Sequence, residues 1–282
     1  MKLPAKIGTG LLISAAAGWV LVQNRWLTTN KYEVRVPDLP KEFDGKKILH
    51  LSDLHGKRYG DGFNNLINSC AFLEPDLVFF TGDLFSRSET NLDPKLLLMQ
   101  RLMRLAPVYY VMGNHEGDAP DRALVLCTKL AEEGVHVLDN RTERITAGEA
   151  HICVTGATLP ITHYRAEAGG YSGRTEITPS LMNSLVGRPE KGVPTFLLVH
   201  DPLPFRAYAE WGASLTFAGH VHGGVVRLPM IGGVFSPERT FFPEYSKGVY
   251  RLGDSQLVVS AGLGKFRLHN PSQIILVTLR SC

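Results

Sequence analysis

The chain has 282 residues, of which 44% are hydrophobic and 20% are charged, as is typical of a globular protein with a substantial core. Its formal net charge of +3 is too small to indicate the strongly basic face that binds nucleic acid, so we expect no nucleic-acid partner. The four cysteines have no paired spacing, which argues against a disulfide framework and against a cysteine-based metal site.

The amino terminus carries an uncharged apolar run of 16 residues, 7–22, preceded by two lysines. A transmembrane helix needs about 17 to 25 residues, and a few flanking residues would supply that length. We therefore expect residues 1–31 to form a single-pass membrane anchor and its linker, and residues 32–282 to form one domain. A cleaved signal peptide and a buried first helix are the alternatives.

Short apolar segments alternate with amphipathic segments over most of the remaining chain. In chain order, strands are predicted at 32–36, 47–52, 76–81, 107–112, 135–138, 151–156, 194–199 and 214–218. Helices are predicted at 63–73, 94–105 and 121–133. This alternation of strands and helices is typical of an α/β sheet with parallel strand pairs.

The last part of the chain has a different pattern. Segments 248–252, 256–260 and 273–279 alternate with short turns, which predicts antiparallel strands. The long segment 158–175 contains several glycines and has little periodicity, so it is either a lid over a functional site or a solvated loop.

Metal-competent side chains lie at the ends of five predicted strands. They are two carboxylates, one amide and four imidazoles: Asp53, His55, Asp83, Asn114, His200, His220 and His222. Ligands of open α/β sheets bind at the carboxyl ends of the strands, so we expect these side chains at one edge. Each short motif alone is weak, but together they supply enough nitrogen and oxygen donors for two divalent cations. Such a pair of metals is suited to in-line displacement at phosphorus.

The glycines next to these side chains have an expected role in the backbone. Gly82, Gly113 and Gly219 each stand directly before a predicted ligand. We expect them to let the chain turn tightly beside the ions.

The ordered set of motifs resembles the calcineurin-like metallophosphoesterase superfamily. The motifs are Asp-x-His at 53–55, Gly-Asp at 82–83, Gly-Asn-His-Glu at 113–116, the isolated histidine at 200 and Gly-His-x-His at 219–222. The resemblance covers about residues 48 to 279. It implies a four-layer αββα sandwich of two mixed β-sheets flanked by helices.

Three further segments, 39–45, 219–229 and 241–250, are similar to the bacterial membrane-associated or exported branch of this superfamily. An amino-terminal anchor or signal is typical of that branch. The resemblance therefore implies a protein of the cell membrane, and we expect its folded domain on the extracytoplasmic side.

The resemblance also implies a division of the ligands. Asp53, His55 and His222 would hold the first metal, and Asn114, His200 and His220 would hold the second. Asp83 would bridge both ions with its two oxygens. Mixed imidazole and oxygen ligands suit Mn²⁺, Fe or Zn²⁺.

His115 is the remaining histidine of the motifs, and the resemblance implies that it is a catalytic proton donor. Its alternative role is to orient a metal ligand. In the expected mechanism a metal-bridging hydroxide attacks phosphorus while His115 protonates or stabilises the leaving alkoxide.

The expected function is metal-dependent hydrolysis of phosphomonoesters or phosphodiesters by a membrane-associated enzyme. The substrate would be a phosphorylated small molecule or a lipid-linked phosphate. A pyrophosphatase or phosphodiesterase that acts on a lipid-linked or nucleotide-sugar substrate is the alternative within enzymes. A non-catalytic binding scaffold is the alternative outside them, although the chain retains all seven ligand positions.

Overall fold

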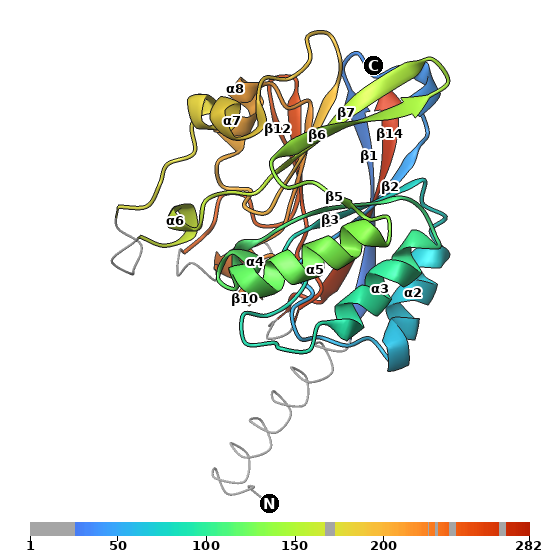
Figure 1. Ribbon diagram of the computed structural model, residues 1–282. Coiled ribbons are helices and arrows are strands. Elements are labelled where there is room, and N and C mark those ends of the chain that lie inside the picture. Colours follow the sequence, from blue (N-terminus) through green and yellow to red (C-terminus); the bar gives the residue numbers. More distant parts are fainter. Residues whose placement is uncertain (1–25, 167–172, 225, 229–230, 237–240, 265–268) are drawn as a thin grey trace, which may run out of the picture.

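The computed structural model describes residues 26–282 except 167–172, 225, 229–230, 237–240 and 265–268 (Figure 1). The predicted membrane anchor, with its apolar run at 7–22, lies outside the described residues. Within the described ranges no helix is both long enough and apolar enough to cross a membrane.

The first of two large sheets has six strands. Their order across the sheet is β1 (Leu27–Val36), β14 (Ser272–Ser281), β2 (Lys47–Leu51), β3 (Leu77–Thr81), β4 (Val108–Val111) and β5 (His136–Val137). Strands β2 to β5 are parallel, because α2 (Asn64–Ala71), α3 (Asp93–Met103) and α5 (Pro120–Glu132) lie between them along the chain. Strand β14 runs antiparallel to β2 and parallel to β1.

The second sheet also has six strands. Their order is β12 (Gly248–Leu252), β13 (Ser255–Val259), β9 (Leu215–Ala218), β8 (Thr195–Val199), β7 (Ala150–Ala157) and β6 (Arg141–Ala147). The inner four strands are parallel, and β12 and β6 form antiparallel pairs at the two edges.

Short elements complete the described fold. They are the 3₁₀ turns η1 (Lys41–Phe43) and η2 (Asp61–Phe63), the helices α4 (Asn114–Gly117), α6 (Ile161–Tyr164), α7 (Pro179–Val186) and α8 (Phe205–Trp211), and the hairpin strands β10 (Val226–Leu228) and β11 (Gly232–Phe235).

Three apolar layers hold the sheets and helices together. Between the sheets, the ring of Phe79 on β3 lies 5.1 Å from that of Phe217 on β9 in an edge-to-face contact. A second cluster packs α2, α3 and α5 against the first sheet, and a third packs α7 and α8 against the second. Helices therefore cover the outer faces of both sheets (Figure 1). The predicted αββα sandwich is confirmed.

The structure differs from the sequence-based expectation at both ends of the domain. Strand β1 begins at Leu27, five residues before the predicted start, because its first residues pair in register with β14 from Ser272 onward. Part of the segment expected to be a linker therefore belongs to the sheet. The antiparallel pattern predicted for the tail holds for β12 with β13 and for β14 with β2. Strand β14 lies in the other sheet, however, and is also parallel to β1.

Candidate metal centre

The carboxyl ends of strands from both sheets meet at one edge, and the predicted ligands follow them. Asp53 and Asp83 come after β2 and β3, and Asn114 begins α4 after β4. His200 and His220 come after β8 and β9 of the second sheet. Five predicted strand ends thus contribute to one region, as the topology of open α/β sheets requires.

The imidazole of His200 is oriented toward the carboxylates by the backbone of the other sheet. Its Nδ1 donates to the carbonyl oxygen of Thr81 at 2.7 Å, which leaves Nε2 as the nitrogen that can bind a metal. Nε2 lies 3.3 Å from Oδ2 of Asp83 and 3.8 Å from Oδ1 of Asp53. An imidazole nitrogen between two carboxylates requires a proton or a cation there.

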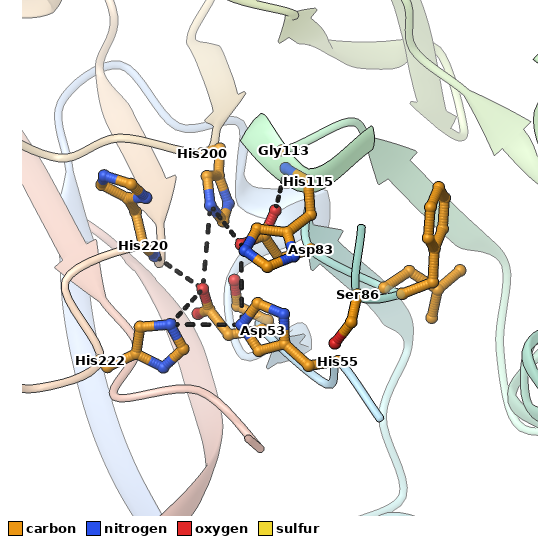
Figure 2. Close-up of polar contacts among 12 residues, drawn as sticks. Asp53, His55, Asp83, Ser86, Gly113, His115, His200, His220 and His222 are labelled. Atoms are coloured by element: carbon orange, nitrogen blue, oxygen red, sulfur yellow. Dashed lines mark hydrogen bonds and ion pairs between the residues drawn. The ribbon is translucent and has the colours of Figure 1, made fainter. Parts of the chain in front are cut away.

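Two further histidines approach the same carboxylates from loops (Figure 2). Nε2 of His55 lies 3.6 Å from Oδ2 of Asp83, and Nε2 of His222 lies 3.8 Å from Oδ1 of Asp53. The two Nε2 atoms are 3.3 Å apart. Asp53, His55 and His222 place their donor atoms within 4.8 Å of one another, as do Asp53, Asp83 and His200.

Five of the seven predicted ligands have left-handed backbone conformations, which residues other than glycine rarely adopt. The φ angles are 53° for Asp53, 50° for His55, 51° for Asp83, 63° for His220 and 53° for His222. Such conformations cost free energy and persist where the surrounding structure enforces them, commonly at functional sites. The strained turns direct side chains of neighbouring loops into one small volume.

The three motif glycines matter chiefly because they lack a side chain. A Cβ on Gly82 would lie 2.6 Å from the Gly113 nitrogen, and one on Gly113 would lie 2.4 Å from Oδ1 of Asp83. A Cβ on Gly219 would lie 2.4 Å from Oδ2 of Asp53. Of these three, Gly82 also has a positive φ, of 84°, so the expected tight turn applies there. At the other two the requirement is close approach of loops.

Glu116 ties the loops after β3 and β4 together. Its buried carboxylate accepts hydrogen bonds from the backbone N–H groups of Asp83 at 2.9 Å, Leu84 at 2.9 Å and Gly113 at 2.8 Å. The first two donors lie in the loop of one predicted ligand, and the third precedes Asn114. Glu116 is therefore a positioning residue for both loops.

His115 lies beside the carboxylates without the same backbone strain. Its Nε2 is 4.0 Å from Oδ2 of Asp83, and its own N–H donates to Oδ1 of that residue at 2.9 Å. The backbone N–H of Arg87 donates to Nδ1 of His115 at 3.1 Å, and Nη2 of the same arginine lies 3.2 Å from Nε2. Burial and the charge of Arg87 lower the pKa of His115, although Asp83 opposes them.

Two arginines extend the site from His115 toward solvent. Nη1 of Arg87 lies 3.1 Å from Oδ2 of Asp118, and Nη2 of Arg165 lies 2.8 Å from the other oxygen of that carboxylate. A shared carboxylate thus holds two guanidinium groups near His115. Guanidinium groups bind phosphate well. Arg87 and Asp118 were not predicted from the sequence, where their only local signal is that each follows a predicted ligand by four residues.

The second predicted ligand set is less closely assembled than the first. The backbone N–H of His220 donates to Oδ1 of Asp53 at 3.0 Å, but its ring points away from the carboxylates (Figure 2). That ring lies 5.0 Å from the ring of His200 and 5.1 Å from the ring of Tyr164. Among the described acids and histidines, the close donor groups do not include His220. Asn114 stands at the start of α4 with its Oδ1 buried.

The segment 158–175, expected to be a lid or a solvated loop, borders this site in its described part. It contributes α6, whose Tyr164 packs against His220. His163 of the same helix contacts Asp201 through Nε2 at 2.8 Å, so this histidine has a partner that the sequence did not indicate. His163 and Asp201, with Arg174 and Arg206, line a cavity of about 700 Å³.

The electrostatics of the cluster favour a cation. Burial raises the pKa of Asp53, and the charge of Asp83 adds to this effect. Burial also acts to raise the pKa of Asp83, but the charges of His200 and of the nearby imidazoles lower it well below its usual value. Burial acts to lower the pKa of His200, but the two carboxylates outweigh it and raise the pKa to about 10. Positive charge near the imidazoles therefore stabilises the buried carboxylates, as a bound cation would.

The residues present fit divalent metal ions. Oδ2 of Asp53 and Oδ1 of Asn114 are buried and have no hydrogen-bond partner among the described residues. A buried polar atom without a partner is costly, and two metal ions, one at each oxygen, would satisfy them. The donors are imidazole nitrogens with carboxylate and amide oxygens, a set that first-row transition metals accept.

Comparison with known proteins agrees with this geometry. The model of the calcineurin-like phosphoesterase family matches residues 46–224, which is more than half of the chain. The chain belongs to the calcineurin-like phosphoesterase family. It is a phosphoric ester hydrolase that depends on divalent metal ions.

Several bacterial and animal proteins are similar to this phosphoesterase. The uncharacterised metallophosphoesterase YkuE of Bacillus subtilis is 25% identical over 255 residues, covering 86% of this chain and 80% of that protein. The phosphodiesterase YaeI of Escherichia coli is 25% identical over 225 residues, covering 77% and 75%. A Bos taurus transmembrane protein with a metallophosphoesterase domain is 29% identical over 244 residues, covering 78% of this chain and 52% of that protein.

Proposed function

We propose that this phosphoesterase hydrolyses phosphodiesters at a membrane surface. Its cofactors would be two divalent transition-metal ions, Mn²⁺, Fe or Zn²⁺. Residues 1–25 would attach the chain to the membrane, and the two-sheet domain would lie on the extracytoplasmic side. The observation that carries the proposed chemistry is the cluster of Asp53, Asp83 and three imidazoles, with His115 beside it.

In the division that the family resemblance implies, Asp53, His55 and His222 would hold one metal, and Asn114, His200 and His220 would hold the other. Asp83 would be a ligand of both. When bound, the cations supply an activated water and neutralise negative charge on the phosphoryl oxygens. Their placement is supported by the contacts of both carboxylates with the imidazoles.

The chain's own residues perform the other steps. Nε2 of His115 lies on the side of the carboxylates, where the protonated ring could donate to the leaving oxygen. The guanidinium of Arg87 lies 3.2 Å from the same nitrogen and can bind a phosphoryl oxygen in front of it. An alkoxide leaving group needs a proton, so a proton donor at this position is suited to phosphate esters of alcohols. The name of the Escherichia coli relative, a phosphodiesterase, supports a diester substrate.

A substrate panel tests this proposal. The full chain is purified in detergent, stripped of metal with a chelator and reloaded with Mn²⁺. It is then assayed on an alkyl phosphodiester, the matching monoester and a pyrophosphate diester. We expect hydrolysis that requires the metal and is fastest for the phosphodiester, and we expect Asp83→Asn to abolish it.

His151→Ala serves as the matched control, because this histidine lies at the start of β7, away from the metal edge. It should retain full activity. Faster release of phosphate from the monoester would contradict the diester assignment. Faster cleavage of the pyrophosphate would favour the alternative substrate class.

A further inference from the structure

Large apolar side chains are exposed around the edge that carries the metal centre. Phe241 is 67% exposed and Phe242 is 61% exposed, and three more exposed apolar residues complete what we call the apolar rim: Trp26, Leu228 and Ile231. Single exposed apolar residues are normal, but a gathering of them marks an interaction surface.

Two residues of the apolar rim, Leu228 and Ile231, belong to the β10–β11 hairpin, which is held next to the metal centre. The hairpin follows His222 after Gly223 and Gly224, and a Cβ on Gly224 would lie only 2.5 Å from Cα of Gly233. Nη1 of Arg227 donates to the carbonyl of Gly223 at 3.1 Å. The hairpin therefore packs closely on the turn that carries a predicted ligand.

The two phenylalanines are fixed to the same hairpin. The N–H of Phe242 donates to the carbonyl of Val234 at 3.0 Å, and the ring of Phe241 contacts the ring of Phe235 at 5.2 Å. Leu228 and Ile231 lie in or next to the hairpin strands. Backbone pairing thus keeps these side chains at the surface.

Trp26 reaches this edge from the other end of the chain. The next residue, Leu27, pairs with Ser272 at the start of β14. Two residues before Ser272, the amide of Asn270 donates to the carbonyl of His222. Trp26 and the hairpin therefore both lie near His222.

Covalent geometry then limits how far the amino-terminal apolar run can be from the metal edge. Only residues 23–25 separate the end of that run from Trp26. Since a chain extends at most about 3.6 Å per residue, the run must end within roughly 15 Å of Trp26. A bilayer that takes up residues 7–22 would be next to this edge.

We propose that the apolar rim docks on the lipid bilayer, so that the metal centre opens toward the headgroup layer. This inference rests on the membrane attachment in the proposed function. Aromatic and aliphatic side chains gain free energy by entering the interface between headgroups and acyl chains. A second copy of the chain is a less suitable occupant, because the attached bilayer would already border this edge. The substrates would be phosphoesters held at the membrane surface.

A fluorescent probe can report the surroundings of the rim in the full chain reconstituted into phosphatidylcholine vesicles. An environment-sensitive dye is attached at Phe242→Cys in a Cys282→Ser background, which removes the exposed native thiol. Phe72→Cys in the same background is the matched control, since Phe72 is 85% exposed at the end of α2, near the opposite edge. We expect lipid-attached quenchers to quench the dye at position 242 and not at position 72.

The same samples separate this inference from the proposed attachment. If the chain floats with the vesicles but the dye at 242 is as accessible to water as that at 72, docking is overturned and attachment stands. If the chain does not float with the vesicles, both are overturned. Cross-linking between two chains through position 242, with no lipid quenching, would identify a second copy as the occupant and overturn docking.

Activity provides a second measurement. The double variant Phe241→Ser/Phe242→Ser should hydrolyse a vesicle-embedded phosphodiester at about one tenth of the unaltered rate or lower. This is the effect expected for the loss of a buried aromatic contact. Its hydrolysis of a soluble phosphodiester should be unchanged, and Phe72→Ser should alter neither rate. Equal losses on both substrates would overturn the inference, because the side chains would then act on the fold and not through the bilayer.

Discussion

At the scale of single residues, His115 differs from the predicted ligands in what its ring nitrogens contact. Its Nδ1 is occupied by the N–H of Arg87, whereas His200 directs Nε2 between two carboxylates. We expect His115→Ala to lower kcat by about 100-fold or more, the usual contribution of a general acid. The bound metal should remain, which elemental analysis of the purified variant would measure beside kcat.

His200→Ala is the informative comparison, because it should remove both metal and activity. An alkyl phosphodiester and a diester with a good leaving group separate the roles further. His115→Ala should affect the alkyl ester more, since only that leaving group needs a proton. If His115→Ala emptied the site of metal, the assignment of His115 as a proton donor separate from the ligands would be wrong.

The sequence was sufficient to find the residues that converge but not all of their partners. Asp53, His55 and His222 were predictable because short motifs place them directly after apolar strands. Arg87 and Asp118 were not, because an arginine and an aspartate on loops resemble ordinary surface residues until the fold places them beside His115. The left-handed backbone conformations at the predicted metal ligands also arise from packing between loops, which no local sequence pattern indicates.

At the scale of elements, the site depends on the connection between the loops after β3 and β4. Glu116→Gln would replace one oxygen of a carboxylate that accepts several backbone N–H groups with an NH₂ group that cannot accept them. Losing a hydrogen bond to a buried charged group costs about 1.5–3 kcal/mol. We expect a lower melting temperature and weaker metal affinity, measured by calorimetry and by metal titration.

Glu149→Gln is the control for this change, since Glu149 is exposed between β6 and β7. It should alter neither quantity. Unchanged metal affinity in Glu116→Gln, together with a normal melting temperature, would show that the two loops hold their positions without the carboxylate.

The boundaries of strands and helices were predictable where short apolar segments alternate with amphipathic segments. The sheet that contains β14 was not predictable, because it is decided by pairing with β1 and β2, which are distant in sequence. Helix α8 was missed because its seven residues are too few to show a helical period. Strand β6 was missed because exposed charged residues alternate along an edge strand.

At the scale of the whole molecule, the two sheets meet at an edge where the buried carboxylates of the first sheet face an imidazole of the second. Asp53 comes from the first sheet and His200 from the second, and a cation between them would join both halves of the sandwich. A ligand that binds only the folded state stabilises it by about 2.7 kcal/mol at one hundred times its Kd. We therefore expect chelation to lower the melting temperature of the full chain in detergent by several degrees.

Calorimetry with and without chelator measures this effect, and added Mn²⁺ or Zn²⁺ should reverse it. Asp83→Asn provides the decisive comparison, because it removes one negative charge from the cluster and one of the two carboxylate oxygens that would bridge the ions. Its melting temperature should hardly depend on metal. Without metal it should be lower than that of the unaltered chain, because the favourable contact between the Asp83 carboxylate and the protonated His200 imidazole is lost. If the unaltered chain melted at the same temperature with and without metal, the two sheets would hold this edge together by packing and hydrogen bonds alone.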